Sequence, residues 1–284
     1  MPFMRAPNCA TGPLQVERTL YRGPCTDCPA GPRLGIIGAM ILDVNGMELH
    51  YDRHGEGKPL VWLHGGLGHG PDWRFIFPAE PPGYQLIAPD LRGHGRSTGA
   101  RATYSFRQSA QDVIELLDHL RLDRVKIIGL SGGGITALHL ANLYPSRVEA
   151  MVVISAPPRF PEQARAIQRQ YAFDPLPDET KAQMRERHRR ERQIDILFAQ
   201  IRAFADGDDP NFTKDDLGRI TANTLIVFGD RDPLYPLSLA VEMREGIRRS
   251  WLWVVPNGGH GPVFGAAAPL FVETALGFLN GAYG

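Results

Sequence analysis

Cysteine is scarce in this chain of 284 residues: there are three, and all of them precede residue 29. Cys25 and Cys28 have CxxC spacing, but a structural zinc site needs four ligands and the chain has no second such pair. Pro24 and Pro29 flank this pair, whereas a redox CxxC begins a helix in a βαβ unit. We therefore interpret the cysteines, Cys9 included, as incidental residues of an N-terminal tail, and the rest of the fold needs no disulfide.

An excess of charge of one sign is also absent, because 31 Lys and Arg residues balance 31 Asp and Glu residues. Such a chain has no overall field that attracts nucleic acid or an anionic membrane. No apolar run approaches the roughly 20 residues that cross a bilayer. The apolar residues 34–42 follow Arg33, far from the start, and no clear small-residue cleavage site follows them. We expect a cytoplasmic protein without a membrane span or a nucleic-acid partner, monomeric or weakly oligomeric.

Apolar runs alternate with amphipathic stretches along most of the chain. Asn45-Gly46 is a strong signal for a two-residue hairpin turn, and it predicts paired antiparallel strands at 34–43 and 47–53. Further strands are predicted at 60–63, 84–89, 125–129, 148–154, 224–228 and 251–255, and helices at 104–120, 135–143, 237–247 and 269–280. This alternation predicts an α/β fold with a mainly parallel sheet, helices on both faces and the hairpin as an antiparallel edge.

One segment, residues 157–221, breaks the alternation. Helical patterns fill it at 162–171, 179–191 and 193–205, with no strand between them. We predict that it forms a helical cap, apolar toward the sheet and charged toward solvent; a basic stripe that binds an anionic substrate is the less favoured alternative. The sheet domain would comprise residues 33–156 and 222–284. Residues 1–32, rich in Pro and Gly, are expected to form an irregular extension.

The sequence Gly-x-Ser-x-Gly follows the buried run 125–129. A serine on a sharp turn between strand and helix has its hydroxyl lifted clear of the sheet. Gly129 and Gly133 flank Ser131 where a Cβ would collide with neighbouring backbone. The amide of Gly132 points at the N-terminus of the following helix, where it can donate a hydrogen bond to an oxyanion. The segment therefore predicts a nucleophile, although a bare motif of this kind also occurs by chance.

A serine nucleophile needs a base that takes its proton and an acid that orients the base. In an open parallel sheet, residues just after the carboxyl ends of strands meet at one edge. Ser131, Asp232 and His260 all follow predicted strands, in the order expected when the nucleophile comes first. We predict that these three residues form the catalytic triad.

Other residues compete for two of these roles. His64, His69 and His94 precede the serine in glycine-rich turns, where an imidazole commonly holds backbone by hydrogen bonds. Asp230 competes with Asp232, and we expect it to accept hydrogen bonds from loop amides instead.

The loop 64–68, with the sequence HGGLG, is the expected source of a second oxyanion donor, because three of its residues lack a side chain and let a ligand approach the backbone. The amide of Gly66 or of Leu67 would act with that of Gly132. Trp73 is interpreted either as a wall of the substrate pocket or as a core residue. The apolar face of the third cap helix supplies further candidates for the pocket: Leu197, Phe198 and Ile201.

Taken together, these motifs resemble the α/β-hydrolase family, in its compact capped form that includes small-molecule esterases and lactonases. The matching segments are HGG at 64–66, DLRGHGRS at 90–97, GLSGG at 129–133, GDRDP at 229–233 and GH at 259–260. The resemblance covers about residues 40–283. It implies an eight-stranded, mostly parallel sheet flanked by helices, with the cap inserted after the sixth strand.

The resemblance also implies a serine hydrolase that cleaves small to medium acyl or aryl esters, or lactones, through an acyl-enzyme, with a small-molecule ester as partner and neither cofactor nor metal. Haloalkane dehalogenases and epoxide hydrolases of this family carry aspartate where this chain has Ser131, and proline iminopeptidases carry proline where it has Leu67. C–C bond hydrolases and cofactor-free perhydrolases share the triad and stay as alternatives. A non-catalytic ligand receptor of the same fold is the alternative from another class.

Overall fold

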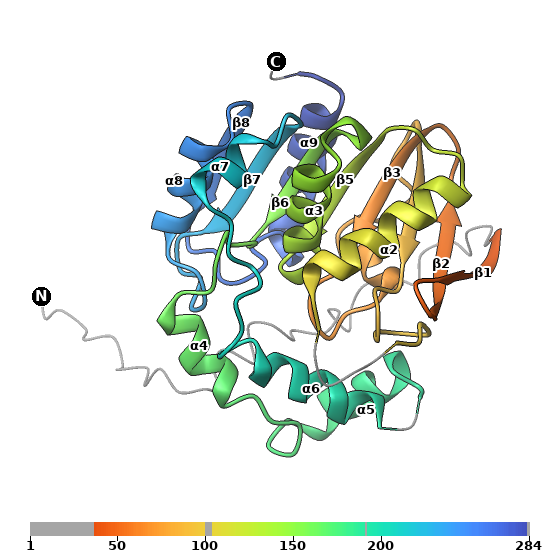
Figure 1. The fold of residues 1–284 in the computed structure, drawn as a ribbon, viewed down its shortest axis with the longest axis vertical. Coiled ribbons are helices and arrows are strands. Elements are labelled where there is room, and N and C mark those ends of the chain that lie inside the picture. Colours follow the sequence, from red (N-terminus) through yellow and green to blue (C-terminus); the bar gives the residue numbers. More distant parts are fainter. Residues whose placement is uncertain (1–36, 100–103, 191, 283–284) are drawn as a thin grey trace, which may run out of the picture.

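A computed structural model describes residues 37–99, 104–190 and 192–282. Its centre is one eight-stranded sheet with the strand order β1-β2-β4-β3-β5-β6-β7-β8 (Figure 1). The predicted N-terminal extension, the three cysteines and the first residues of the predicted strand 34–43 lie outside the described residues.

The strands are β1 (Ile37–Val44), β2 (Met47–His54), β3 (Lys58–Leu63), β4 (Tyr84–Pro89), β5 (Val125–Leu130), β6 (Val148–Ile154), β7 (Asn223–Gly229) and β8 (Ser250–Val255). β2 runs antiparallel to both of its neighbours, and every pairing from β4 to β8 is parallel. The hairpin turns at Asn45-Gly46, where both residues have positive φ. The predicted mostly parallel sheet with an antiparallel hairpin edge is confirmed.

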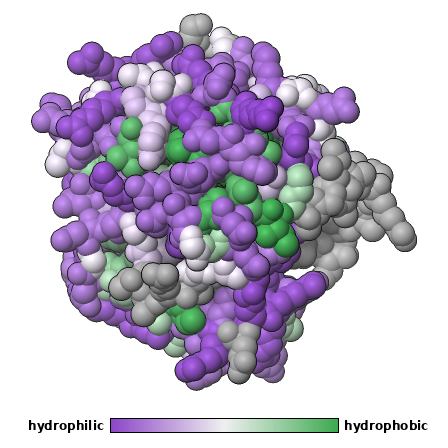
Figure 2. Space-filling view, turned by 45° about the vertical axis from the view of Figure 1, so that its right-hand side comes forward, coloured by the Kyte–Doolittle hydropathy of each residue, from purple (hydrophilic) through white to green (hydrophobic). Residues whose placement is uncertain are grey.

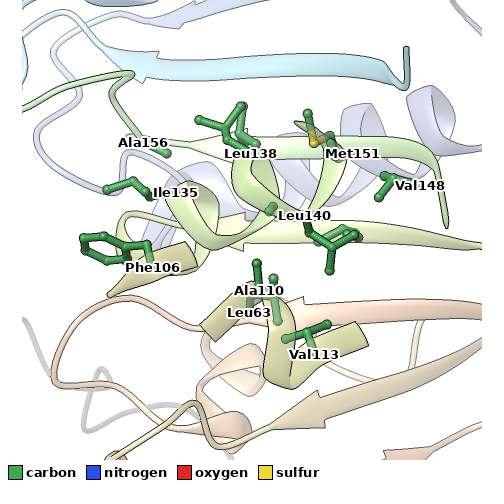
Figure 3. Packing of buried hydrophobic residues seen from close by; sticks show 14 of the residues in the cluster. Leu63, Phe106, Ala110, Val113, Ile135, Leu138, Leu140, Val148, Met151 and Ala156 are labelled. Atoms are coloured by element: carbon green, nitrogen blue, oxygen red, sulfur yellow. The ribbon is translucent and has the colours of Figure 1, made fainter. Parts of the chain in front are cut away.

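Helices cover both faces of the sheet, as predicted. α2 (Phe106–His119), α3 (Gly132–Leu143) and α8 (Leu237–Gly246) contribute to one buried cluster, and α9 (Ala268–Leu279) contributes to the cluster on the other face. Figure 3 shows side chains of α2 and α3 packed against the strands beneath them. The face made by α2, α3 and α8 contains the larger apolar core, and it fixes α3, whose first turn follows Ser131.

Between β6 and β7, the residues that the structure describes form no named strand and four helices: α4 (Glu162–Arg169), α5 (Asp178–Arg187), α6 (Gln193–Ala203) and α7 (Lys214–Gly218). The first three form a layer across one end of the sheet (Figure 1), and they are called the cap helices below. The short helix α7, which falls inside the predicted cap, packs against α8 instead, because Leu217 is buried in the main core. The division into cap and sheet domain stays a prediction, and the last part of the predicted cap segment lies with the sheet.

The surface shown in Figure 2 is mostly hydrophilic, with small hydrophobic areas. Few large apolar side chains are well exposed; Ile41 and Leu270 are the most exposed of these, at 58% and 59%. Among the described residues, the helices are too short or too polar to cross a bilayer.

Candidate active site

Ser131 lies on a sharp turn between β5 and α3. Its backbone has φ 49° and ψ −116°, a conformation that costs free energy and is found mainly at functional sites. A Cβ on Gly129 would come within 2.7 Å of the Gly133 carbonyl oxygen, and a Cβ on Gly133 within 2.1 Å of the Leu63 carbonyl oxygen. Both glycines are therefore required by the close packing of this turn, for the reason the sequence suggested.

The three residues predicted as a triad lie together. Nε2 of His260 is 3.0 Å from Oγ of Ser131, and Nδ1 of His260 is 2.9 Å from Oδ2 of Asp232. The other carboxylate oxygen of Asp232 accepts hydrogen bonds from the amides of Leu234 and Tyr235. These bonds fix the carboxylate, which in turn fixes the imidazole with its Nε2 toward the serine.

The competing residues lie elsewhere. Asp230 is exposed, and it is Asp232 that accepts the loop amides, contrary to our expectation. His64 donates from Nδ1 to the Gly65 carbonyl and accepts the Leu91 amide at Nε2, and His94 donates to the Arg92 carbonyl, so these two hold backbone as expected.

His69 differs from that expectation. Its Nδ1 lies 2.9 Å from Oδ1 of Asp72, so its partner is a carboxylate and not a backbone group. The reason is local: Asp72 is three residues farther along, in the first turn of the short 3-10 helix η1 (Gly70–Phe75).

Two of the residues predicted to form the oxyanion hole, Gly66 and Gly132, lie close together. A Cβ built on Gly132 would lie 3.6 Å from the Gly66 nitrogen, so the loop 64–68 approaches the start of α3 closely. Within the described part of the chain, no hydrogen bond from the Gly66 or Leu67 amide is found, and an amide in the first turn of a helix has no partner within the helix. The same Cβ would lie 3.1 Å from Phe106, so an aromatic ring packs beside Gly132.

Tyr235 is a site residue that sequence reasoning missed. Its hydroxyl lies near Ser131, and its ring meets that of His260 edge-on at 5.2 Å. Burial and the neighbouring Asp232 carboxylate raise the pKa of Tyr235 above its ordinary value, so the phenol stays protonated. The sequence feature that could have identified Tyr235 as a site residue is its position three residues after the predicted acid, Asp232.

The four residues predicted to line the pocket belong to buried clusters. Trp73 is fully buried in the core on the α9 face of the sheet, which decides against a role in the pocket. Leu197 and Phe198 are buried in a separate cluster between the cap helices and Leu67, and Ile201 packs against the same cluster. The apolar face of α6 therefore contacts the loop 64–68.

The structure also links the cap to the sheet domain through polar residues for which we predicted no role. His188, which follows α5, donates from Nε2 to the Leu67 carbonyl at 3.0 Å and accepts the Gly95 amide at Nδ1 at 3.0 Å. Gln193 donates to the carbonyls of Gly93 and Gly95. In the sequence His188 stands among arginines, but it lies four residues after the buried Met184 and so shares its helix face.

The charged residues of α5 contact the protein as well as solvent. The Arg185 guanidinium lies 5.3 Å from the centre of the Phe173 ring, and the Arg187 guanidinium lies 5.7 Å from the centre of the Phe75 ring. Such contacts favour a cap that is charged outside over a basic stripe reserved for an anionic substrate. Over residues 37–99, 104–190 and 192–282, no three His, Cys, Asp or Glu side chains are grouped as metal ligands would be.

Comparisons with known proteins point to one family. A family model described as alpha/beta hydrolase fold matches residues 58–174. The serine hydrolase BPHL of Mus musculus is 30% identical over 235 residues, which are 76% of this chain and 78% of that protein.

Two solved structures resemble the fold over most of its length. The meta-cleavage product hydrolase CumD of Pseudomonas fluorescens matches with a TM-score of 0.72 and 25% identity, over 88% of this chain and 98% of that one. Est816, an N-acyl homoserine lactone degrading enzyme, matches with a TM-score of 0.66 and 28% identity, over 84% of this chain and 100% of that one.

Proposed function

The chain belongs to the α/β-hydrolase fold family and is a hydrolase, and from that premise we propose that it cleaves carboxylic esters, lactones included, through an acyl-enzyme on Ser131. The observation that carries this proposal is the continuous line of hydrogen bonds from Ser131 through His260 to Asp232, at 3.0 and 2.9 Å. The serine hydrolase and lactone-degrading relatives support the same reaction class.

The reaction follows from the positions of these groups. Oγ of Ser131 attacks the carbonyl carbon while His260 accepts the hydroxyl proton at Nε2. Asp232 stabilises the imidazolium that forms. The amides of Gly132 and of Gly66 or Leu67 bind the negative oxygen, which develops only as the carbonyl becomes tetrahedral, so they favour the transition state over the substrate.

The second half of the reaction repeats these steps with water. The tetrahedral adduct collapses, and the leaving alkoxide takes the proton from Nε2 of His260. Water then enters, gives a proton to the same nitrogen and attacks the acyl carbon. The second adduct releases the acid and returns the proton to Ser131, so the enzyme is regenerated without a cofactor.

The direct test is Ser131→Ala, assayed with p-nitrophenyl acetate and butyrate. Turnover should fall by about 10⁴-fold or more, because the remaining groups cannot act without the nucleophile, while the melting temperature stays close to that of the wild type. Ser146→Ala, at an exposed serine, is the matched control and should keep full activity. Retention of more than a few per cent of the activity in Ser131→Ala would rule out the assignment.

Hydrolysis of a C–C bond is a second candidate, because the meta-cleavage product hydrolase matches with a higher TM-score than Est816 does. That reaction would use the same triad on a vinylogous diketone. Comparing kcat/KM for such a substrate with that for butyryl and aryl esters separates the two: a value at least a hundredfold higher for the diketone would favour C–C hydrolysis.

A further inference from the structure

Leu67 has a backbone conformation that is unfavourable for leucine. It is the third residue of a turn in which the Gly68 amide donates to the Gly65 carbonyl at 3.1 Å, and its φ is 59°. The left-handed region is unfavourable for a residue with a Cβ, and glycine is the usual choice there. The contacts that Leu67 makes with the rest of the protein must therefore offset this cost.

Those contacts come from the cap. The Leu67 side chain is 2% exposed and lies in a cluster whose other buried members all belong to the segment between β6 and β7: Leu176, Met184, Leu197 and Phe198. The Leu67 carbonyl accepts its hydrogen bond from Nε2 of His188. Both ends of the residue, side chain and carbonyl, are thus held by the cap and not by the sheet domain.

His188 is well suited to hold this carbonyl. The Gly95 amide can only donate and the Leu67 carbonyl can only accept, so the imidazole has its proton on Nε2 and none on Nδ1. Burial and the neighbouring His94 lower the pKa of His188 to about 3, which keeps the ring neutral. The ring therefore spans two loops of the sheet domain from one position on the cap.

We propose that His188 is a positioning residue for the reaction: through the Leu67 carbonyl it holds the loop 64–68 in the shape that presents the Gly66 or Leu67 amide to the oxyanion. Docking of the cap is then a condition for a complete oxyanion hole, in addition to any contact between cap and substrate. This inference rests on the proposed function of the two amides.

The consequence for catalysis follows from the geometry. An oxyanion donor is effective only within about 0.5 Å of its position, and a misplacement of about 1 Å can cost up to 100-fold in rate. The donor acts mainly on the charge that develops as the carbonyl becomes tetrahedral, and much less on the ground-state carbonyl. Loss of the His188 contact should therefore lower kcat and leave KM nearly unchanged.

Two substitutions separate the bonds of His188. In His188→Asn the amide oxygen takes the place of Nδ1, so the bond from the Gly95 amide can form while the bond to Leu67 is lost. In His188→Gln the terminal amide reaches the place of Nε2 and can still donate to the Leu67 carbonyl. We expect kcat for p-nitrophenyl butyrate to fall about tenfold or more in the Asn variant and less than about threefold in the Gln variant.

A control distinguishes this role from simple attachment of the cap. Gln193→Ala removes two hydrogen bonds between cap and sheet domain without touching the loop 64–68. Its kcat should stay within about twofold of the wild type, with a lower melting temperature. The binding of phenylboronic acid, which forms a tetrahedral adduct with the serine, should weaken in His188→Asn in proportion to kcat and be unchanged in Gln193→Ala.

The outcomes are distinct. If the Asn and Gln variants lose equal activity, or if Gln193→Ala loses as much as His188→Asn, then His188 only attaches the cap and the proposal is overturned. If the wild type neither turns over an ester nor binds the boronate, the proposed function fails, and this proposal fails with it. Normal wild-type turnover with an unaffected His188→Asn would contradict the role of His188 alone.

Discussion

Three neighbouring buried imidazoles, those of His64, His94 and His188, should make the protein sensitive to mild acid. His64 and His94 are 5.1 Å apart between ring centres, and His94 and His188 are 6.1 Å apart. Burial lowers the pKa of these histidines to about 3, 4 and 3 respectively, from about 6.5 in an unfolded chain. At pH values between the folded-state and unfolded-state pKa values, the unfolded chain binds more protons than the folded protein. The free energy of unfolding therefore decreases as the pH falls through this range.

The size of the loss can be worked out at pH 5.5. Each histidine with a folded-state pKa of about 4 or lower reduces the free energy of unfolding at pH 5.5 by about 1.4 kcal/mol relative to pH 7.5. The exact folded-state pKa hardly changes this figure, because it lies well below pH 5.5. Together the three should remove roughly 4 kcal/mol, a large part of the 5–15 kcal/mol of a typical domain. The buried carboxylates Asp72 and Asp90 have lowered pKa values, so they titrate at lower pH and do not contribute in this range.

The assay is urea unfolding followed by tryptophan fluorescence at pH 7.5 and pH 5.5. His94→Asn keeps a donor for the Arg92 carbonyl, and its pH-dependent loss should be smaller than that of the wild type by about 1.4 kcal/mol, whatever its stability at pH 7.5. His119→Asn, at an exposed position at the end of α2, should show the wild-type difference. A wild-type loss below about 1 kcal/mol, or equal losses in His94→Asn and the wild type, would refute the reasoning.

Three further substitutions test the catalytic triad, a buried ion pair and the packing of the turn that carries Ser131. Asp232→Asn should lower kcat by about 10⁴-fold with the fold retained, because the amide no longer stabilises the imidazolium; a loss below tenfold in ester assays would remove Asp232 from the mechanism. Asp112→Ala leaves the guanidinium of Arg92, 8% exposed, without its carboxylate, and urea unfolding should show a loss of about 3–5 kcal/mol. Gly133→Ala places a Cβ 2.1 Å from the Leu63 carbonyl oxygen, so most of the protein should be insoluble or unfolded by circular dichroism, and a native melting curve would contradict the packing described.

Local patterns were sufficient for most of the sheet domain. The strands Tyr84–Pro89 and Val148–Ile154 have the predicted bounds, since short apolar runs between turn signals identify buried parallel strands. The bounds of α3 were less well predicted: it begins at Gly132, not at residue 135, because glycines carry no helix signal and the turn geometry alone starts the helix there. The helix α7 was not predicted, since five residues are too few for a periodic pattern.

Predictions about side-chain environment were less successful. Trp73 and Phe198 were both considered for the pocket, and both are buried in clusters that join near neighbours to residues from distant parts of the chain. An aromatic residue carries the same sequence signal whether it lines a cavity or fills a core. Tyr235 was missed for a related reason, because its contact with Ser131 joins residues that are far apart in the sequence.

The sequence by itself determined the family and the order of strands and helices, and it predicted that Ser131, Asp232 and His260 would lie together, as they do in the structure. Those predictions succeed because turns and strand ends depend on neighbouring residues, and because parallel strands bring their ends to a common edge whatever the details of packing. The tertiary structure alone decided that the cap holds Leu67, through His188, which is 121 residues away. Contacts of that kind depend on how surfaces formed by distant segments fit together, and no local pattern of residues encodes that fit.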